Sequence, residues 1–188
     1  MKRLVKGFTM IELLIVIAVL GVLAVAVLSA INPIEQINRG RDTGSRSDAE
    51  QLLTAIDRYY TATELYPWQT VVDVNEEVTP LTSIGTLIDD SAAPGVLVLT
   101  KLSTGGTAEL KTSFTNRITG AVNQIQVYFT GTDGDSVYAC FNPRSSSFDD
   151  AAWVRCIDID GSGLPTDLQG AAADVCAGGV GERLSCLP

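Results

Sequence analysis

The sequence predicts an α+β protein in which one long N-terminal helix, with a membrane-spanning half and a packed half, precedes an antiparallel β-sheet. Three observations support this prediction. An unbroken apolar run, FTMIELLIVIAVLGVLAVAVLSAI, occupies residues 8–31, helical periodicity resumes after it, and short strand-like segments follow further on. A length of 188 residues suffices for one ordinary domain with an appended helix.

The apolar run is long enough to cross a membrane. As a helix its 24 residues extend about 36 Å, against ~30 Å for a hydrocarbon core. Three basic residues precede it, which places the N-terminus on the cytoplasmic side; they are Lys2, Arg3 and Lys6. A cleaved secretory signal using Ala24-Val25-Ala26 is the weaker alternative, because the run continues past that site.

A plain membrane anchor leaves one residue unexplained, the carboxylate of Glu12 near the start of the run. The stretch from Lys6 to Glu12, KGFTMIE, resembles the N-terminus of type IV pilins and pseudopilins. The resemblance covers about the first 30 residues. It implies that a prepilin peptidase cuts between Gly7 and Phe8 and N-methylates the new Phe8 amine. It also implies that Glu12 serves assembly and methylation, and the seven-residue leader resembles the short, type IVa kind.

Electrostatics fits the same interpretation of Glu12. Cleavage would leave a cationic amine on Phe8, one helical turn before Glu12, and a carboxylate is favoured at the positive end of a helix dipole. In a bundle of such helices, the amine of an incoming copy would be a strong partner in a low dielectric. Glu12 could instead pair with the amine of its own chain, and one partner could replace the other during assembly.

The segment after the apolar run predicts an interrupted helix. Pro33 should end or kink the helix, and Gly40 and Gly44 weaken helix propensity in the polar stretch that follows. A helical pattern resumes at Ser47 and should end near Leu65. The predicted division is a leader at 1–7, a transmembrane and assembly helix at 8–31, its continuation at 32–66, and a β-rich head at 67–188 with two disulfides.

The head contains five strand-like segments, which are 96–100, 108–114, 122–130, 136–141 and 152–159. A shorter helix or strand is expected near Leu81 to Ile88. Asp133-Gly134 predicts a tight hairpin turn, and glycine-rich irregular chain is expected from Gly161 onward. The predicted apolar helix face that covers the sheet consists of Ala49, Leu52, Leu53, Ile56 and Tyr60.

Four cysteines lie in the last 49 residues, at Cys140, Cys156, Cys176 and Cys186. An even count behind an export segment predicts two disulfides, and the absence of histidine and of C-x-x-C spacing argues against zinc. Three pairings are possible. We favour 140–156 with 176–186, because local loops are cheap to close. A C-terminal disulfide loop is common in pilins, so the resemblance makes the 176–186 loop its counterpart.

An Asp-rich loop begins at Asp158. Counted from that residue, positions 1, 3 and 5 have side-chain oxygens and position 6 is glycine, as in the first half of a calcium loop. Position 12 is Gln169 where such a loop has a bidentate glutamate. Some type II secretion pseudopilins bind calcium near the C-terminus, and the alternative is a glycine-rich turn capped by Asp side chains. The candidate ligands are Asp158, Asp160, Ser162 and Asp167.

Charge and residue types exclude several functions. The formal charge is −9, and without the three leading basic residues it is −12, so nucleic-acid binding by the bulk of the protein is disfavoured. Arg39, Arg41 and Arg46 form the one basic cluster beyond the leader and suit a solvated helix face or lipid headgroups. With no histidine, no nucleophile–base pairing and no phosphate-binding loop, no enzyme is predicted.

Taken with the resemblance, the sequence predicts a structural subunit of a type IV pilus-like filament. Its expected partners are a prepilin peptidase, further copies of itself and an inner-membrane assembly platform. The precursor would span the inner membrane once, and the filament would lie outside the cell or in the periplasm. The alternatives are a pseudopilin of a type II secretion or DNA-uptake system, and an anchored calcium-binding or adhesion domain that does not polymerise.

Overall fold

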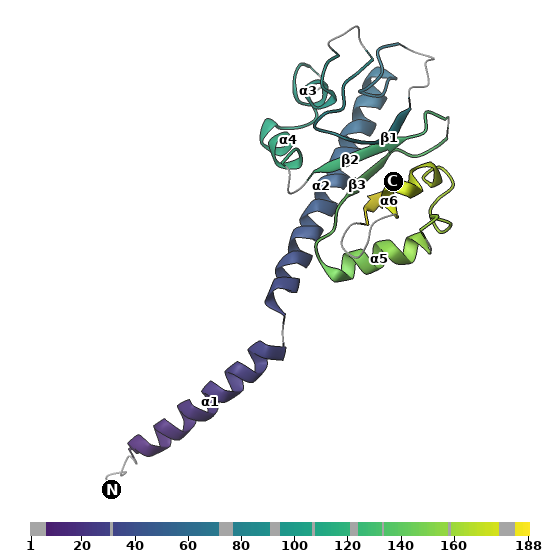
Figure 1. The fold of residues 1–188 in the computed structure, drawn as a ribbon. Helices are drawn as coiled ribbons and strands as arrows, with labels where there is room; N and C mark the ends of the chain where they lie inside the picture. Colours follow the sequence, from purple (N-terminus) through teal and green to yellow (C-terminus); the bar gives the residue numbers. More distant parts are fainter. Residues whose placement is uncertain are drawn as a thin grey trace. The chain divides into compact units, whose positions relative to one another are not determined.

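The structure is a computed structural model that describes residues 7–30, 32–71, 77–90, 95–106, 108–120, 124–132, 134–157, 159–176 and 183–188. The chain divides into two compact units, Met1–Ile37 and Asn38–Pro188, and each is described by itself. The elements of both units appear along the chain in Figure 1.

The first unit contains helix α1, Met10–Ala30, and the first turn of α2, Pro33–Thr63. Pro33 occupies the first helical position of α2, where its missing N–H is not needed. The predicted interruption near Pro33 is therefore confirmed. The predicted restart at Ser47 is wrong, because α2 runs unbroken through Gly40 and Gly44. Tertiary contacts of the following residues outweigh the low helix propensity of two glycines.

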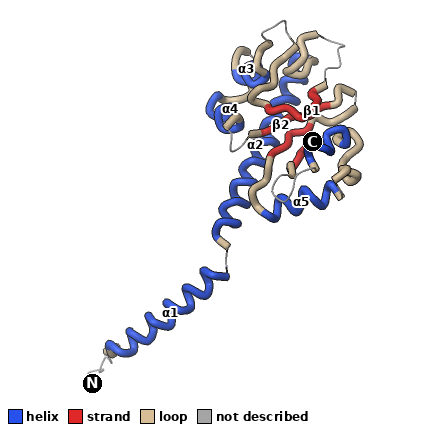
Figure 2. Tube along the Cα trace, in the orientation of Figure 1, coloured by secondary structure: helices blue, strands red, loops and turns tan. Residues whose placement is uncertain are grey.

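The second unit is built on a four-stranded antiparallel sheet. The strands are β1 (Val78–Ser83), β2 (Ile125–Phe129), β3 (Tyr138–Phe141) and β4 (Ser185–Leu187), in the order β1-β2-β3-β4. The antiparallel sheet and two predicted strands, now β2 and β3, are confirmed (Figure 2). Gly134, with φ +93°, lies in the connection between them, whereas Asp133 lies outside the described residues.

The apolar face of α2 packs against this sheet. Ala49, Leu52 and Ile56 are fully buried and share one core with residues of β2 and β3 such as Val127. That part of the predicted face is confirmed, whereas Tyr60 at its end is 45% exposed. The spacing of i, i+3 and i+7 gives one stripe along the helix, and its burial holds α2 to the head.

Three predicted strands are wrong, because the structure places short helices there. The segment 96–100 contributes to α3 (Val98–Ser103), 108–114 to α4 (Thr112–Ile118), and 152–159 to α5 (Ser146–Cys156). Buried residues recur three or four positions apart in each helix, and α3 and α4 also have adjacent buried pairs. Such short segments have too few apolar positions for periodicity to distinguish a helix from a strand. The buried residues of α3 and α5 are Val98, Leu99, Leu102, Asp149, Ala152 and Cys156.

The C-terminal segment is more regular than the glycine content predicts. It contains a 3₁₀ turn, η1 (Gln169–Ala171), helix α6 (Ala172–Val175), and the edge strand β4. Its apolar residues form a second core on the other side of the sheet from α2, around Tyr128, Tyr138, Leu164, Leu168 and Val175. Figure 1 shows α5 and α6 on the side of the sheet away from α3 and α4.

Candidate processing and assembly site

Thr9 and Glu12 cap the start of α1 reciprocally. Glu12 Oε2 accepts hydrogen bonds from the Thr9 backbone N–H at 2.9 Å and from its hydroxyl at 2.6 Å. In return, the Glu12 backbone N–H donates to Thr9 Oγ1 at 3.3 Å. This is a capping box, with Thr9 at the N-cap and Glu12 three positions later. The two side chains therefore satisfy two backbone N–H groups at the helix start, the carboxylate that of Thr9 and the Thr9 hydroxyl that of Glu12.

Thr9 was not among the predicted site residues, although the T-x-x-E spacing before an apolar run is the signal for this motif. The structure gives Glu12 an intrachain role that neither predicted amine pairing includes. Oε1 of Glu12 has no hydrogen-bond partner among the described residues, so one carboxylate oxygen is left for another group. Pairing with the Phe8 amine of the same chain or of a neighbour stays a prediction.

Gly7 and Phe8 are exposed and lie directly before the capped helix. Cleavage of the bond between them would retain the peptide bond from Phe8 to Thr9. The Thr9 N–H would therefore still donate to Glu12, and the capping box would stay complete. No contact in the described residues buries this bond. The arrangement suits a processing site, and cleavage and methylation there remain predictions.

Apart from Glu12 and Ser29, the side chains of α1 are apolar, and they are exposed on every side of the helix. Its large apolar residues are between 47% and 86% exposed, and the helix has no apolar partner within the described chain. The segment Met10–Ser29 has a mean hydropathy of 3.1, and it is the one described helix long and apolar enough to cross a membrane. A helix that is apolar all round needs a lipid or a protein environment. This fits a membrane-anchored precursor.

Residues 2–28 match the family model of the prokaryotic N-terminal methylation motif. The match covers all of the predicted leader except Met1, together with the capping box and most of α1. The chain thus carries the prepilin-type motif of type IV pilins and pseudopilins, which indicates a structural subunit. No curated protein sequence and no solved structure shows a significant match to this chain.

The favoured disulfide pairing is wrong. The structure joins Cys140 to Cys186 and Cys156 to Cys176, with Cα–Cα separations of 4.0 and 5.9 Å. Cys140 and Cys186 are register partners on β3 and β4, and Cys156 ends α5. Loop length alone does not predict the observed pairing, because it takes no account of the C-terminal strand β4. Sheet register brings Cys186 next to Cys140, and this outweighs the small entropic cost of the longer loop.

Two of the four candidate calcium ligands, Asp160 and Asp167, accept hydrogen bonds from other groups of the chain. Asp160 Oδ1 accepts from the Ser162 backbone N–H at 3.0 Å, which closes a local turn. The Asp167 carboxylate accepts from the Ser136 N–H at 3.0 Å and from the Tyr138 hydroxyl at 2.8 Å. Asp158 lies outside the described residues, and the described part contains no group of three or more metal-binding side chains. Calcium binding at this loop stays a prediction.

The Asp167–Tyr138 contact instead ties the Asp-rich loop to the sheet. Burial raises the pKa of the Tyr138 phenol to about 12, and the hydrogen bond to Asp167 adds to this. Burial also pushes the pKa of Asp167 upward, but the hydrogen bonds from Ser136 and Tyr138 outweigh it, and the pKa is lowered. The pair is therefore a carboxylate and a neutral phenol at neutral pH.

The predicted basic cluster lies exposed on α2. Arg39, Arg41 and Arg46 all face solvent, and Arg46 Nε is 3.2 Å from Glu50 Oε1, an i,i+4 ion pair. An exposed pair of this kind contributes little to stability. The geometry agrees with a solvated helix face, and contact with lipid headgroups remains a prediction.

Proposed function

We propose that this protein is a structural subunit of a type IV pilus-like filament. It is made as a membrane-inserted prepilin, cleaved after Gly7, N-methylated on Phe8 and polymerised through its N-terminal helix. The observation that carries the proposal is a prepilin-type motif at the start of a capped helix whose apolar side chains are all exposed. Exposing these apolar side chains to water is unfavourable. The helix can therefore leave the lipid only if other helices surround it and bury those side chains.

Mechanistically, α1 supplies the apolar interior of the filament and the acidic head forms its outer layer. Oxygen Oε2 of Glu12 keeps the helix start closed, and Oε1 is the atom available to a neighbouring Phe8 amine. Within packed helices the dielectric is low, so this pair is stronger there than in water. Where the receiving copy lacks the Glu12 carboxylate, the amine of the incoming copy is buried without a partner, which disfavours assembly.

The direct test is the mass of the mature N-terminus, expected to be N-methylated Phe8. The variant Gly7→Val should retain the leader, whereas Gly21→Ala, at an open position on α1, should be processed normally. A mature chain that starts elsewhere, or that is not methylated, contradicts the proposal.

Glu12→Ala tests assembly separately from processing. We expect a cleaved protein and little filament, while Asp57→Ala, which removes an exposed carboxylate on α2, gives normal filaments. Normal filament yield from Glu12→Ala would contradict the role given to the carboxylate, because the capping box and the amine pair would both be lost.

Electron microscopy of shed material separates this proposal from the two alternatives. Long surface filaments made mainly of this chain support a major pilin, and short periplasmic assemblies formed with a secretion or DNA-uptake machine support a pseudopilin. An anchored calcium-binding domain would show no polymer. It would also show a higher melting temperature with Ca²⁺ than with a chelator, and Asp160→Ala would abolish this difference.

A further inference from the structure

We propose that the head has a binding site for a phosphate group, in a polar pocket between α2 and α4. The pocket has a volume of about 430 Å³. Two arginines line it, Arg41 from the first half of α2 and Arg117 from α4. Its other described lining residues all come from α2, and they are Gly44, Ser45, Ser47, Asp48 and Gln51. The whole set lies in the second unit of the chain.

Arg117 is held in place by a bidentate ion pair across 69 positions of sequence. Its Nε lies 3.0 Å from Asp48 Oδ2, and its Nη2 lies 2.7 Å from Asp48 Oδ1. The guanidinium also lies over the Phe114 ring, 5.2 Å from the ring centroid. Asp48 is buried and accepts only two of the five N–H groups of Arg117, whose side chain is 51% exposed. The other N–H groups, including both on Nη1, are therefore available to a ligand from a guanidinium of fixed position.

Arg41 supplies a second positive charge, which its own chain leaves uncompensated. It is exposed, and within the described part of the chain it has no hydrogen bond or ion pair. No acidic residue lies three or four positions from it along α2, whereas Arg46 on the same helix pairs with Glu50. Asp48 is the one carboxylate among the described lining residues and already pairs with Arg117. A bound anion would balance the remaining positive charge.

Small residues line the pocket beside Arg41. A Cβ added at Gly44 would meet no neighbouring atom within 4 Å, so the space at this position is open. Ser45 is half-buried and Ser47 is exposed, and a serine hydroxyl can donate to an oxyanion. Guanidinium groups match the geometry of phosphate oxygens, and a phosphate accepts more hydrogen bonds than a carboxylate does. These donors therefore favour a phosphate group over a cation or a neutral ligand.

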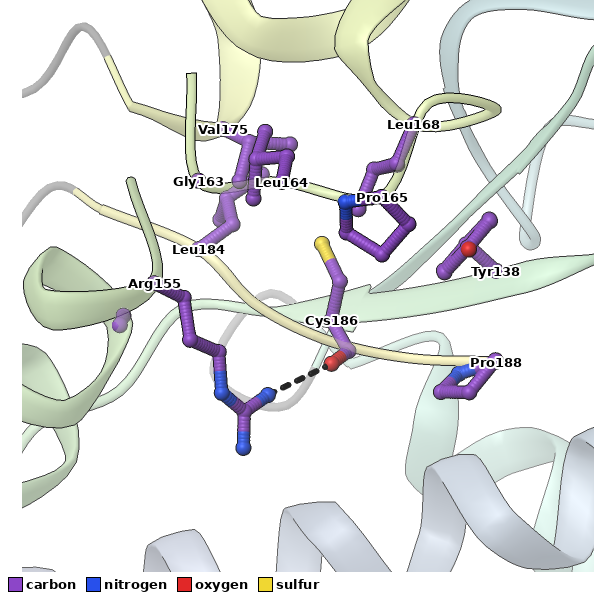
Figure 3. Close-up of a pocket in the computed structure, with 11 residues that line it drawn as sticks. Tyr138, Arg155, Gly163, Leu164, Pro165, Leu168, Val175, Leu184, Cys186 and Pro188 are labelled. Carbon is purple, nitrogen blue, oxygen red and sulfur yellow. Dashed lines mark hydrogen bonds between the residues drawn. The ribbon is translucent and has the colours of Figure 1, made fainter. Parts of the chain in front are cut away.

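The second pocket of the head, which Figure 3 shows, has a different chemistry. It lies between α5, the 163–168 loop and β4, with a volume of about 290 Å³ and mostly apolar walls. Arg155 is the one charged side chain among its described lining residues, and its Nη1 donates to the Cys186 carbonyl at 3.1 Å. One guanidinium beside apolar walls offers an anion few donors. The pairing of Arg41 with Arg117 distinguishes the polar pocket as the phosphate site.

Titration calorimetry of inorganic phosphate into the full chain, in a phosphate-free detergent, is the first test. Arg41→Gln should weaken binding about tenfold or more, because it removes charge-assisted hydrogen bonds. Arg46→Gln is the matched control, since it removes the same charge from the same helix outside the pocket, and it should bind like the wild type. Equal affinities of the two variants overturn the inference.

Gly44→Met tests the pocket with both arginines in place. The methionine side chain would occupy the open space, and it favours a helix more than glycine does, so the fold should be retained. Phosphate binding should weaken about tenfold or more. Gly40→Met, at the other open glycine of α2, should bind normally. Gly44→Met that binds as tightly as Gly40→Met overturns the inference. Arg117→Gln is a poorer test, because it leaves the buried Asp48 carboxylate without its partner.

The phosphate has two natural sources, free phosphate and a phospholipid headgroup, since α2 directly follows the apolar helix α1 in the chain. Native mass spectrometry of the full chain, extracted from vesicles of phosphatidylcholine and phosphatidylglycerol, separates them. A headgroup ligand predicts a phospholipid that the wild type and Arg46→Gln retain and that Gly44→Met and Arg41→Gln lose. A free phosphate ligand predicts calorimetric binding with equal lipid retention in all four chains.

A wild-type chain that binds neither inorganic phosphate nor a phospholipid at this pocket overturns the inference. Binding is measured on single chains and requires neither cleavage after Gly7 nor polymerisation. Failure of the phosphate site therefore leaves the proposed function standing, and failure of the proposed function leaves the phosphate site standing.

Discussion

The carboxylate of Asp42 accepts hydrogen bonds from both the backbone N–H and the hydroxyl of Ser145, at 2.7 and 2.5 Å, across 103 positions of sequence. It also accepts from the Arg144 N–H at 3.0 Å. Ser145 is the N-cap residue of α5, and its own side chain makes no capping bond. A buried side chain of α2 therefore supplies the anion that the N-terminus of α5 favours.

Asp42→Asn should destabilise the head by about 2–4 kcal/mol, because the amide loses the charge and places donors against buried N–H groups. Thr43→Ala, at the next and exposed position, should change stability by less than about 0.5 kcal/mol. Chemical unfolding of the detergent-solubilised chain measures both. Equal stability of the two variants would mean that Asp42 does not hold α5.

Tryptic mapping without reduction distinguishes the disulfide pairings directly. Trypsin cuts after Arg144, Arg155 and Arg183. The observed pairing then yields peptide 118–144 joined to 184–188, and a separate peptide 156–183 with an internal disulfide. The sequential pairing would instead join all three peptides into one species, which would show that the bonds in the structure are wrong.

Stability should fall at alkaline pH through Tyr138. Its pKa is raised to about 12 in the folded state, above the ordinary value of 10, so folding favours the neutral phenol. The stabilisation is complete below pH 10 and is lost as the pH rises toward 12. Between pH 10 and 12 the free energy of unfolding should fall less steeply with pH in Tyr138→Phe than in the wild type. The difference in slope should correspond to about one proton. Tyr60→Phe, at an exposed tyrosine, should follow the wild type, and a Tyr138→Phe curve parallel to the wild type would refute this assignment.

Thr9→Val should open the first turn of α1 while leaving the rest of the helix intact. Valine has a similar shape but cannot bond Glu12 through a hydroxyl, so the Glu12 amide loses its acceptor. In lipid micelles, hydrogen exchange at the Glu12 amide should become several-fold faster in Thr9→Val and stay near wild type in Thr9→Ser. Unchanged exchange in both variants would show that the capping box is not formed in the membrane.

Sequence reasoning predicted those parts that depend on long or well-marked patterns. The apolar run of α1 and the motif around Glu12 are such patterns, as is the burial stripe of Ala49, Leu52 and Ile56. The helices α3, α4 and α5 were missed because six to eleven residues give too little periodicity to separate helix from strand.

The disulfides and the Asp42 cap were missed for a different reason. Each joins residues that only the assembled fold brings together, as β4 brings Cys186 to Cys140. A carboxylate in a polar helical stretch, such as Asp42, gives no sign in sequence that it will be buried beneath Ser145. Thr9 is the exception, since its spacing to Glu12 was visible and was not used.

The capping box begins one residue beyond the predicted cleavage point, so the helix start does not depend on the leader. Cutting after Gly7 would remove Lys2, Arg3 and Lys6 and leave a single new amine, while the bonds between Thr9 and Glu12 stay in place. Before cleavage three cationic side chains hold this end of the helix at the cytoplasmic face. After cleavage only the new amine would do so. Cleavage would thus loosen the helix from its membrane face without unwinding it, and a subunit could be withdrawn from the lipid as a rigid rod.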